Sequence, residues 1–218
     1  MISLDLHDAI PSEGRVLAIG SHADDIEIGC GGTLLALTRE RSDLSVTWVV
    51  LTAEGSRADE ARASAESFLA GAGSADVEIF GHRESFFPYC GADVKETFEQ
   101  LKAVEPDLIL THARHDLHQD HRLTCELTWN TFRDHLILEY EIPKYDGDLG
   151  APNVFVPLDE AIVADKLRLI RTHFPSQADR HWFDEELFRG LMRLRGMECA
   201  TRYAEAFTCR KLVFRGGG

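Results

Sequence analysis

The sequence predicts an α/β fold, a Rossmann-like three-layer arrangement in which helices flank a mainly parallel sheet. Short apolar runs alternate along the chain with stretches of helical character, an order typical of parallel sheets. The run SVTWVVLT at 45–52 is continuous and rich in β-branched residues, as expected for a strand buried on both faces. A length of 218 residues suits one domain, so we expect a single domain over residues 1–218.

The first half of the chain is expected to contain four strands and three helices. Arg15–Gly20 is a short apolar run that ends at a glycine, which indicates a buried strand. Asp59–Gly71 is rich in alanine and has acidic residues in its first turn, which favours a helix. Pro106 and Asp107 precede the apolar run Leu108–Thr111, the fourth strand. The other expected elements are helices at Gly31–Arg41 and Val94–Val104 and strands at Ser45–Thr52 and Asp76–Phe80.

The second half adds helices and further strands. The expected elements are a helix at Asp120–Asp134, strands at Leu136–Ile142 and Asn153–Pro157, helices from Asp159 to about His173 and from Asp184 to about Met197, and a final strand at Arg210–Phe214. In sheets of this kind ligands bind beyond the carboxyl ends of the strands. The residues that follow each strand are therefore the first candidates for a functional site.

The composition argues against two classes of partner. Lys and Arg number 23 against 37 Asp and Glu, which gives a formal net charge of −14. A protein this acidic repels phosphate backbones at long range, so we expect no nucleic-acid partner. No apolar stretch approaches the ~18–20 residues that a membrane-crossing helix needs, so we expect no membrane span. The oligomeric state stays open, and a homo-oligomer is compatible with this composition.

The five cysteines favour a reducing compartment. Their number is odd and no two of them form a C-x-x-C pair, which argues against a disulfide framework or a structural zinc ribbon. Free thiols are typical of reduced intracellular proteins, so we expect a cytoplasmic location.

Two dense clusters of histidine and carboxylate follow the first and fourth expected strands, at residues 21–29 and 111–121. Neutral imidazole and carboxylate suit Zn²⁺, and a catalytic zinc takes three protein ligands and a water. Asp24 and Asp25 are neighbours, so their side chains should diverge. One of them can hold a metal while the other faces the water.

The spacing within each cluster brings ligand-type groups together. His22 and Asp25 are three residues apart across a turn into a helix, so both can reach one ion. His118 and His121 are also three apart, which places both on one face of a helix start. Spacing alone leaves open which of these two histidines binds metal. Asp120, between them, is placed to orient one imidazole through its free N–H.

Both clusters resemble the signatures of a known enzyme family. Residues 22–25, His-Ala-Asp-Asp, followed by Gly29, resemble the His-Pro-Asp-Asp motif of the LmbE-like/PIG-L deacetylases, which are metal-dependent N-acetylglucosaminyl deacetylases. Residues 118–121, His-Gln-Asp-His, resemble the family's second motif, His-x-Asp-His. The resemblance runs from Arg15 to about Leu127 and more loosely to the end. Ala23 stands where proline is common in the family.

The resemblance implies a role for each motif residue. His22, Asp25 and His121 would be the metal ligands, Asp24 the general base, and His118 the group that stabilises the oxyanion or acts as general acid, with Asp120 orienting it. The cofactor would be Zn²⁺, with Fe²⁺ as the alternative. The reaction would remove an N-acetyl group from an N-acetylglucosamine-type amino sugar or glycoconjugate, giving acetate and a free amine. The alternative substrate is a non-sugar N-acyl metabolite.

Substrate-binding residues are expected after the other strands. In relatives an R-x-x-E segment supplies an arginine to the pocket, and Arg57 with Glu60 matches it. Many relatives have an acid at the position of Glu84, where it can accept bonds from sugar hydroxyls. Lys144 and Asp146 lie in a polar, turn-rich segment that we expect to form a pocket wall. Lys144 would meet an anionic group such as a phosphate or uronate.

Three other functions compete with this interpretation. Gly29–Gly32 after the first strand suggests a dinucleotide-binding enzyme, but the glycines do not follow G-x-G-x-x-G and acidic residues precede them. Two histidines and a carboxylate also suit Fe(II) and oxygen chemistry. A non-catalytic sugar-binding domain would not need Asp24 and His118 beside a metal.

Overall fold

The computed structural model describes residues 1–213 and contains a seven-stranded sheet with the order β3-β2-β1-β4-β5-β7-β6. Its strands are β1 (Arg15–Gly20), β2 (Ser45–Val50), β3 (Ser74–Ile79), β4 (Leu108–His112), β5 (Leu136–Tyr140), β6 (Val154–Leu158) and β7 (Tyr203–Thr208). The first five strands are parallel, and β7 runs antiparallel to both of its neighbours. In the register of the central strands, Val16 pairs with Val46 on one side and with Leu108 on the other. The predicted mainly parallel sheet is confirmed.

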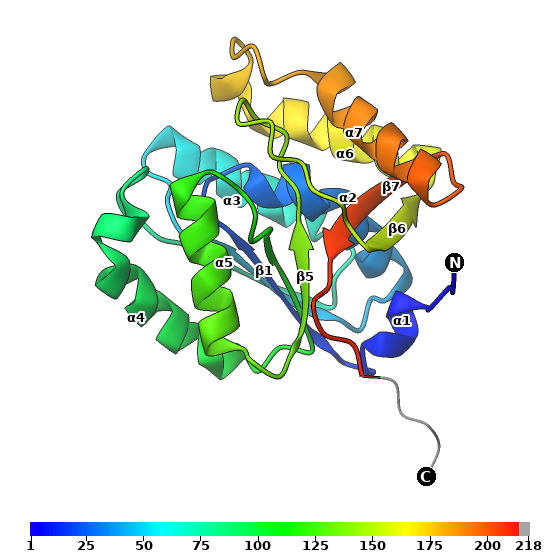
Figure 1. Cartoon of the computed structure of the whole chain (residues 1–218). Helices are drawn as coiled ribbons and strands as arrows, with labels where there is room; N and C mark the ends of the chain where they lie inside the picture. The colour runs from blue at the N-terminus through cyan, green and yellow to red at the C-terminus, as the bar shows by residue number, and fades with distance from the viewer. Residues whose placement is uncertain (214–218) are drawn as a thin grey trace.

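Helices cover both faces of this sheet (Figure 1). They are α1 (Leu6–Ala9), α2 (Asp25–Glu40), α3 (Ser56–Phe68), α4 (Gly91–Leu101), α5 (Gln119–Thr131), α6 (Glu160–His173) and α7 (Glu185–Glu198). Side chains alternate between the faces of a strand, so Val16 and Ala18 of β1 pack into one core beneath α2, α3, α6 and α7. Leu17 and Ile19 pack into a second core beneath α4 and α5. The molecule is therefore the three-layer sandwich that the sequence predicts.

The final strand was predicted in the wrong place. It spans Tyr203–Thr208, whereas Arg210–Val213 form no strand and Phe214 lies outside the described residues. An acid in the middle of the run YAEAFT hides the strand from a search for apolar runs. The structure accepts this acid because Glu205, 4% exposed, receives hydrogen bonds from the backbone N–H groups of Gly32 and Thr33 in α2.

Helix α2 begins six residues earlier than predicted, at Asp25 rather than Gly31. The glycines that obscured its start allow close packing. A Cβ on Gly29 would lie 2.2 Å from the ring of Tyr140, and one on Gly31 would lie 2.6 Å from Phe68. Gly29–Gly32 thus sit inside a buried helix and pack against side chains, which does not match the phosphate-binding loop of a dinucleotide-binding enzyme.

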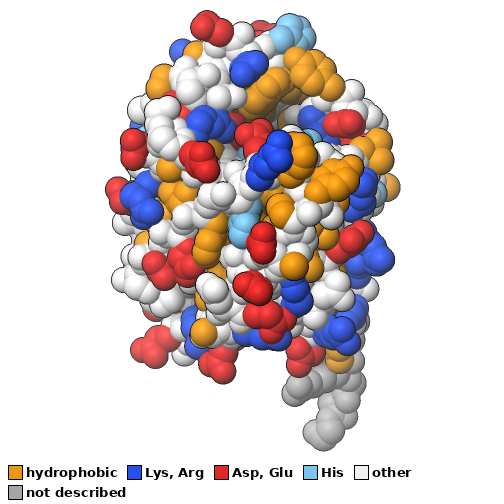
Figure 2. Space-filling view, turned by 90° about the vertical axis from the view of Figure 1, so that its left-hand side faces the viewer, with side chains coloured by type: hydrophobic (Ala, Val, Ile, Leu, Met, Phe, Trp, Pro, Cys, Tyr) orange, Lys and Arg blue, Asp and Glu red, His pale blue; other side chains and the backbone are white. Residues whose placement is uncertain are grey.

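The surface carries charges of both signs. On the face drawn in Figure 2, Lys and Arg side chains are interspersed with Asp and Glu, and hydrophobic side chains gather near the top of the view. Among the helices of residues 1–213, none is long and apolar enough to cross a membrane.

Candidate active site

The two histidine-rich segments meet at the carboxyl edge of the sheet. One connects β1 to α2 and the other connects β4 to α5, and β1 and β4 are neighbouring parallel strands. The chain order of the strands reverses direction at this pair, which is where ligands bind in open α/β sheets. A hydrogen bond of 2.8 Å between the hydroxyls of Ser21 and Thr124 joins the first segment to α5.

Three potential metal-binding side chains converge at this edge. Nδ1 of His22 lies 3.1 Å from Nε2 of His121 and 3.3 Å from Oδ2 of Asp25. Nε2 of His121 lies 3.5 Å from Oδ1 of Asp25. Zinc–ligand distances of about 2.0–2.2 Å in a tetrahedral site place neighbouring ligand atoms roughly 3.3 Å apart. The donor set and its spacing therefore fit a single divalent cation.

A carboxylate holds the far nitrogen of each of these two imidazoles. Oδ2 of Asp116 lies 2.9 Å from Nδ1 of His121, and Oδ2 of Asp120 lies 3.3 Å from Nε2 of His22. Asp120 is fixed in turn by the backbone N–H groups of Ser85 and Phe87, at 2.6 and 3.2 Å. Such contacts set the ring orientation and aim the remaining nitrogen at a common point.

The structure corrects the expected role of Asp120. Its carboxylate contacts His22, whereas it was expected to orient His118. Nδ1 of His118 instead accepts a hydrogen bond of 3.3 Å from the backbone N–H of Asp120 and so caps helix α5. Burial and the nearby His22 lower the pKa of His118, which favours the neutral imidazole.

His112 is a site residue that sequence reasoning did not assign. It is fully buried at the end of β4, and its ring stacks on that of His121 with centroids 3.9 Å apart. Its Nε2 accepts a hydrogen bond of 3.0 Å from the backbone N–H of Ser21 and lies 3.2 Å from Oδ2 of Asp25. The sequence did offer one indication of this role, because His112 is the last residue of a strand, where ligands bind in such sheets.

Asp24 differs from its neighbour Asp25 in its contacts and in its acidity. It occupies the N-cap position of α2, yet its carboxylate makes no capping bond. Its polar contact at 3.4 Å is with Nη2 of Arg57. Burial and the charge of Asp25 raise the pKa of Asp24. The pKa of Asp25 is lowered well below its usual range, because the nearby histidines outweigh the effect of burial. The two adjacent carboxyls thus differ in acidity.

A cavity of about 260 Å³, here called the site cavity, lies over these groups. It is lined by His22, Asp24, Asp25, Ile28, Arg57, Glu84, His118, His121, Ile142, Pro143, Lys144, Tyr145, Gln177 and Trp182. Three of the four expected substrate-binding residues, Arg57, Glu84 and Lys144, therefore face it. Asp146 is exposed and is not among the described residues that line the cavity.

The two cations of the site cavity already have acidic partners. Nζ of Lys144 lies 2.9 Å from Asp116 and 2.6 Å from Asp148, while Arg57 contacts Asp24. Glu60, the acid of the R-x-x-E segment, does not pair with Arg57. It accepts a hydrogen bond of 3.0 Å from the backbone N–H of Ser176. The expectation that Lys144 meets an anionic substrate group therefore has no geometric support here.

Comparison with known proteins identifies the family. The family model PIG-L, described as GlcNAc-PI de-N-acetylase, matches residues 17–132, more than half of the 218-residue chain. The chain therefore belongs to the PIG-L family, as its motifs indicate. A search of curated proteins found no match.

Solved structures share the fold at low sequence identity. The N,N'-diacetylchitobiose deacetylase of Pyrococcus horikoshii is 21% identical, with a TM-score of 0.71 over 90% of this chain and 83% of that one. The 4-carboxy-2-hydroxymuconate hydratase GalB of Pseudomonas putida is 16% identical, with a TM-score of 0.75 over 94% and 99%. A teicoplanin deacetylase in a zinc-inhibited form is 16% identical, with a TM-score of 0.66 over 89% and 97%.

Proposed function

We propose that this protein is a metal-dependent N-deacetylase that removes the acetyl group from an N-acetylglucosamine-type amino sugar or glycoconjugate. The observation that carries the proposal is the convergence of His22, Asp25 and His121 within 3.5 Å of one another, with the carboxylate of Asp24 beside them in the same cavity. Membership of the PIG-L family and the likeness to deacetylase structures support the same reaction. The absence of disulfides among the five cysteines supports a cytoplasmic location.

Each residue of the cavity then has a defined task. A divalent metal held by His22, Asp25 and His121 would supply Lewis-acid polarisation of the acetamide carbonyl and a more acidic water. Asp24 accepts the proton of the attacking water, for which a raised pKa is suited. Arg57 holds the carboxylate of Asp24 toward the cavity.

His118 serves the developing negative charge on the acetamide oxygen. Because Nδ1 accepts the backbone N–H of Asp120, a neutral ring carries its proton on Nε2, which can donate to that oxygen. The departing amine then takes the proton held by Asp24. This assignment makes the neutral form of His118 the active one, in agreement with the direction of its pKa shift.

A second candidate is hydration of an unsaturated carboxylic acid. The likeness to the hydratase GalB, at a TM-score of 0.75, favours it. The charges of the cavity disfavour it, because a polyanionic substrate needs free cations and both Arg57 and Lys144 already face carboxylates. A non-sugar N-acyl metabolite remains the alternative amide substrate.

One experiment separates these functions. The purified protein is analysed for zinc and iron, stripped with a chelator, reloaded with each metal, and assayed for amine release from a panel of N-acetyl hexosamines and non-sugar acetamides. We expect one metal per chain and amine release that disappears on stripping and returns on reloading. Amine release that survives stripping, or turnover confined to hydration of unsaturated acids, would overturn the proposal.

A further inference from the structure

A second depression adjoins the site cavity. This outer groove has a volume of about 480 Å³ and is lined by Pro143, Lys144, Tyr145, Gly147, Leu149, His181, Trp182, Asp184, Glu186 and Leu187. Four of these residues, Pro143, Lys144, Tyr145 and Trp182, also line the site cavity. The two hollows are therefore adjacent and share part of their walls.

The site cavity alone is small for a glycoconjugate. Its 260 Å³ fall below the roughly 300–1,000 Å³ typical of pockets for drug-sized ligands. An acetyl group placed at the converging atoms of His22 and His121 occupies the inner end, so the part of a substrate beyond the amine must extend outward. The shared walls direct that extension into the outer groove.

Apolar side chains form much of the outer groove. Tyr145 is 78% exposed, Leu149 43% and Leu187 38%, while Trp182 is half-buried and packs against the main core. Large apolar side chains gathered in a hollow indicate a binding surface rather than a random feature of the exterior. An aromatic ring such as Tyr145 presents a flat apolar face on which a ring of the ligand can pack.

Acidic side chains outnumber basic ones in and around the outer groove. Its cation, Lys144, is held between Asp116 and Asp148, whose two carboxylates outnumber it. Its other charged lining residues, Asp184 and Glu186, are acidic. Asp184 also caps α7 by accepting the backbone N–H of Glu186 at 2.6 Å.

We propose that the outer groove binds a second ring of the substrate, attached to the amino sugar on the side away from the acetyl group, and that it selects a neutral or cationic ring over an anionic one. This inference rests on the proposed deacetylation and names the substrate class for the same site. It replaces the expectation of a phosphate or uronate at Lys144.

The test compares kcat/KM for amine release from four compounds. They are N-acetylglucosamine and disaccharides in which its second ring is neutral glucose, cationic glucosamine or anionic glucuronate. We expect the neutral and cationic disaccharides to exceed the monosaccharide by about tenfold or more, the lower end of what apolar contacts contribute to specificity. The glucuronate compound should not exceed the monosaccharide.

Two variants and a matched control locate the effect. Leu187→Ala should bring the ratio of kcat/KM between neutral disaccharide and monosaccharide toward one. Glu186→Lys should raise kcat/KM for the glucuronate compound relative to the neutral one. Tyr89→Ala is the control, because Tyr89 is 78% exposed, like Tyr145, but lies at η1 (Phe87–Tyr89) away from the groove lining. Its ratios should match the wild type.

The outcomes distinguish this inference from the proposed function. Equal kcat/KM for monosaccharide and neutral disaccharide in the wild type, or ratios untouched by Leu187→Ala, would overturn the groove assignment while leaving deacetylation in place. Without amine release from any compound, deacetylation of these sugars fails. In that case the fluorescence of Trp182 tests binding in the outer groove. The signal of Trp182 is obtained as the difference between the wild type and Trp182→Phe. Quenching by the neutral but not the anionic disaccharide supports the groove assignment, and any other pattern overturns it.

Discussion

Helix α2 touches two buried polar clusters that are built in opposite ways. The first, here the converging cluster, lies at its N-terminal end and contains His22, Asp25 and His121. The second, the paired cluster, lies halfway along the helix and contains Lys166 of α6 and Glu205 of β7. All but His22, which is partly exposed, are at most 4% exposed, so solvent screens neither cluster well.

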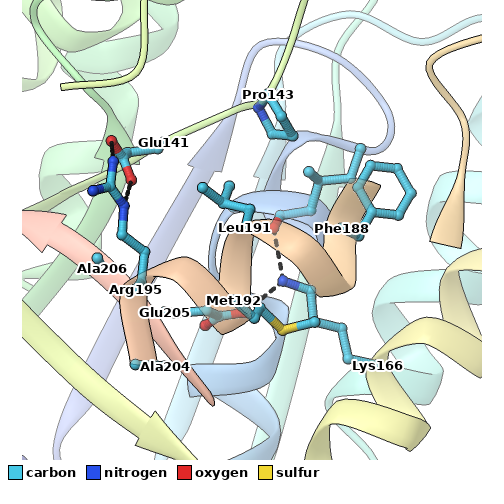
Figure 3. Close-up of a pocket in the computed structure, with 12 residues that line it drawn as sticks. Glu141, Pro143, Lys166, Phe188, Leu191, Met192, Arg195, Ala204, Glu205 and Ala206 are labelled. Carbon is cyan, nitrogen blue, oxygen red and sulfur yellow. Dashed lines mark hydrogen bonds and ion pairs between the residues drawn. The ribbon is translucent and has the colours of Figure 1, made fainter. Parts of the chain in front are cut away.

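The paired cluster satisfies its own charges (Figure 3). Nζ of Lys166 donates to the carbonyl of Ile28 at 2.7 Å and to Oε1 of Glu205 at 2.6 Å. Glu205 also accepts the backbone N–H groups of Gly32 and Thr33 at 2.8 and 2.7 Å. In a regular helix the N–H of Gly32 would donate to the carbonyl of Ile28. The pair engages both of these groups and fastens α2 to α6 and the sheet.

The converging cluster, in contrast, does not satisfy all of its polar atoms. Two imidazole nitrogens face each other at 3.1 Å and a carboxylate lies against both. Without a metal, only a proton on an imidazole can link these acceptor atoms. Behind them, Nδ1 of His112 is buried with no hydrogen-bond partner among the described residues. Buried polar groups that are poorly paired cost stability, and a cation offsets that cost. The comparison separates a charge pair that holds the fold together from the cluster that we propose binds a metal.

The largest expected effect distinguishes catalysis from stability. Asp24→Asn should lower kcat by about 10²–10⁴-fold, because it removes the proton acceptor. It should leave bound metal per chain unchanged, because Asp24 is not among the converging ligands. Kinetics and metal analysis on the same preparation check both halves. Asp93→Asn, at an exposed first-turn acid of α4, is the control. A rate near that of the wild type would refute the role of Asp24.

The next effect is on the paired cluster. Lys166→Met should lower the free energy of unfolding by about 3–5 kcal/mol, because it leaves the carboxylate of Glu205 buried and uncompensated. Urea unfolding measures this loss. The double variant with Glu205→Gln should recover part of it. Lys102→Met, which breaks an exposed pair with Glu99, should cost at most about 1 kcal/mol. Equal losses from Lys102→Met and Lys166→Met would contradict the comparison.

Metal removal should affect only the converging cluster. At a free metal concentration about 100 times Kd, binding stabilises the native state by about 2.7 kcal/mol. A chelator should therefore lower the Tm of the wild type by roughly 5–11 °C, at about 2–4 °C per kcal/mol for a chain of this size. Lys166→Met should show the same shift from a lower starting Tm, and His121→Ala should show none. A chelator response in His121→Ala would place the metal elsewhere.

The position of the converging cluster could be predicted from the sequence because the prediction required only that two strands lie close together in the sheet. Residues after parallel strands share one edge of the sheet, so the segments of His22 and His121 had to approach if β1 and β4 are close. The resemblance to the two family motifs then implied which residues would be the ligands. The alternation of strands and helices likewise predicted the layers, since it depends on burial along single elements.

Contacts that depend on loop conformation or on distant partners could not be predicted. Asp116 lies five residues before His121, in the loop that precedes α5, and this spacing has no periodic signal. The neutralisation of Lys144 needs Asp116 and Asp148, which approach it only in the folded loop. Glu205 was missed for the same reason, because its partners are backbone N–H groups of a distant helix.

The smallest expected effect concerns one proton on His22. Burial acts to lower the pKa of this imidazole, but the carboxylates of Asp25 and Asp120 outweigh burial and raise it to about 10. In the unfolded chain the pKa is about 6.5. The resulting stabilisation is therefore fully present below pH 6.5 and is lost as the pH rises from 6.5 through about 10.

Metal competes with this proton, because a ligating imidazole must be neutral. Between pH 7 and 9 the stability of the stripped protein should fall, while its apparent affinity for zinc should rise by about tenfold per pH unit from the release of one proton. Urea unfolding and competition with a zinc-binding dye measure the two trends. His22→Gln removes the proton and should flatten the stability trend. Lys166→Met keeps the proton on His22, so its stability should still fall with pH as in the wild type. If the affinity of the wild type for zinc does not depend on pH, zinc binding does not release a proton from His22, and the prediction is wrong.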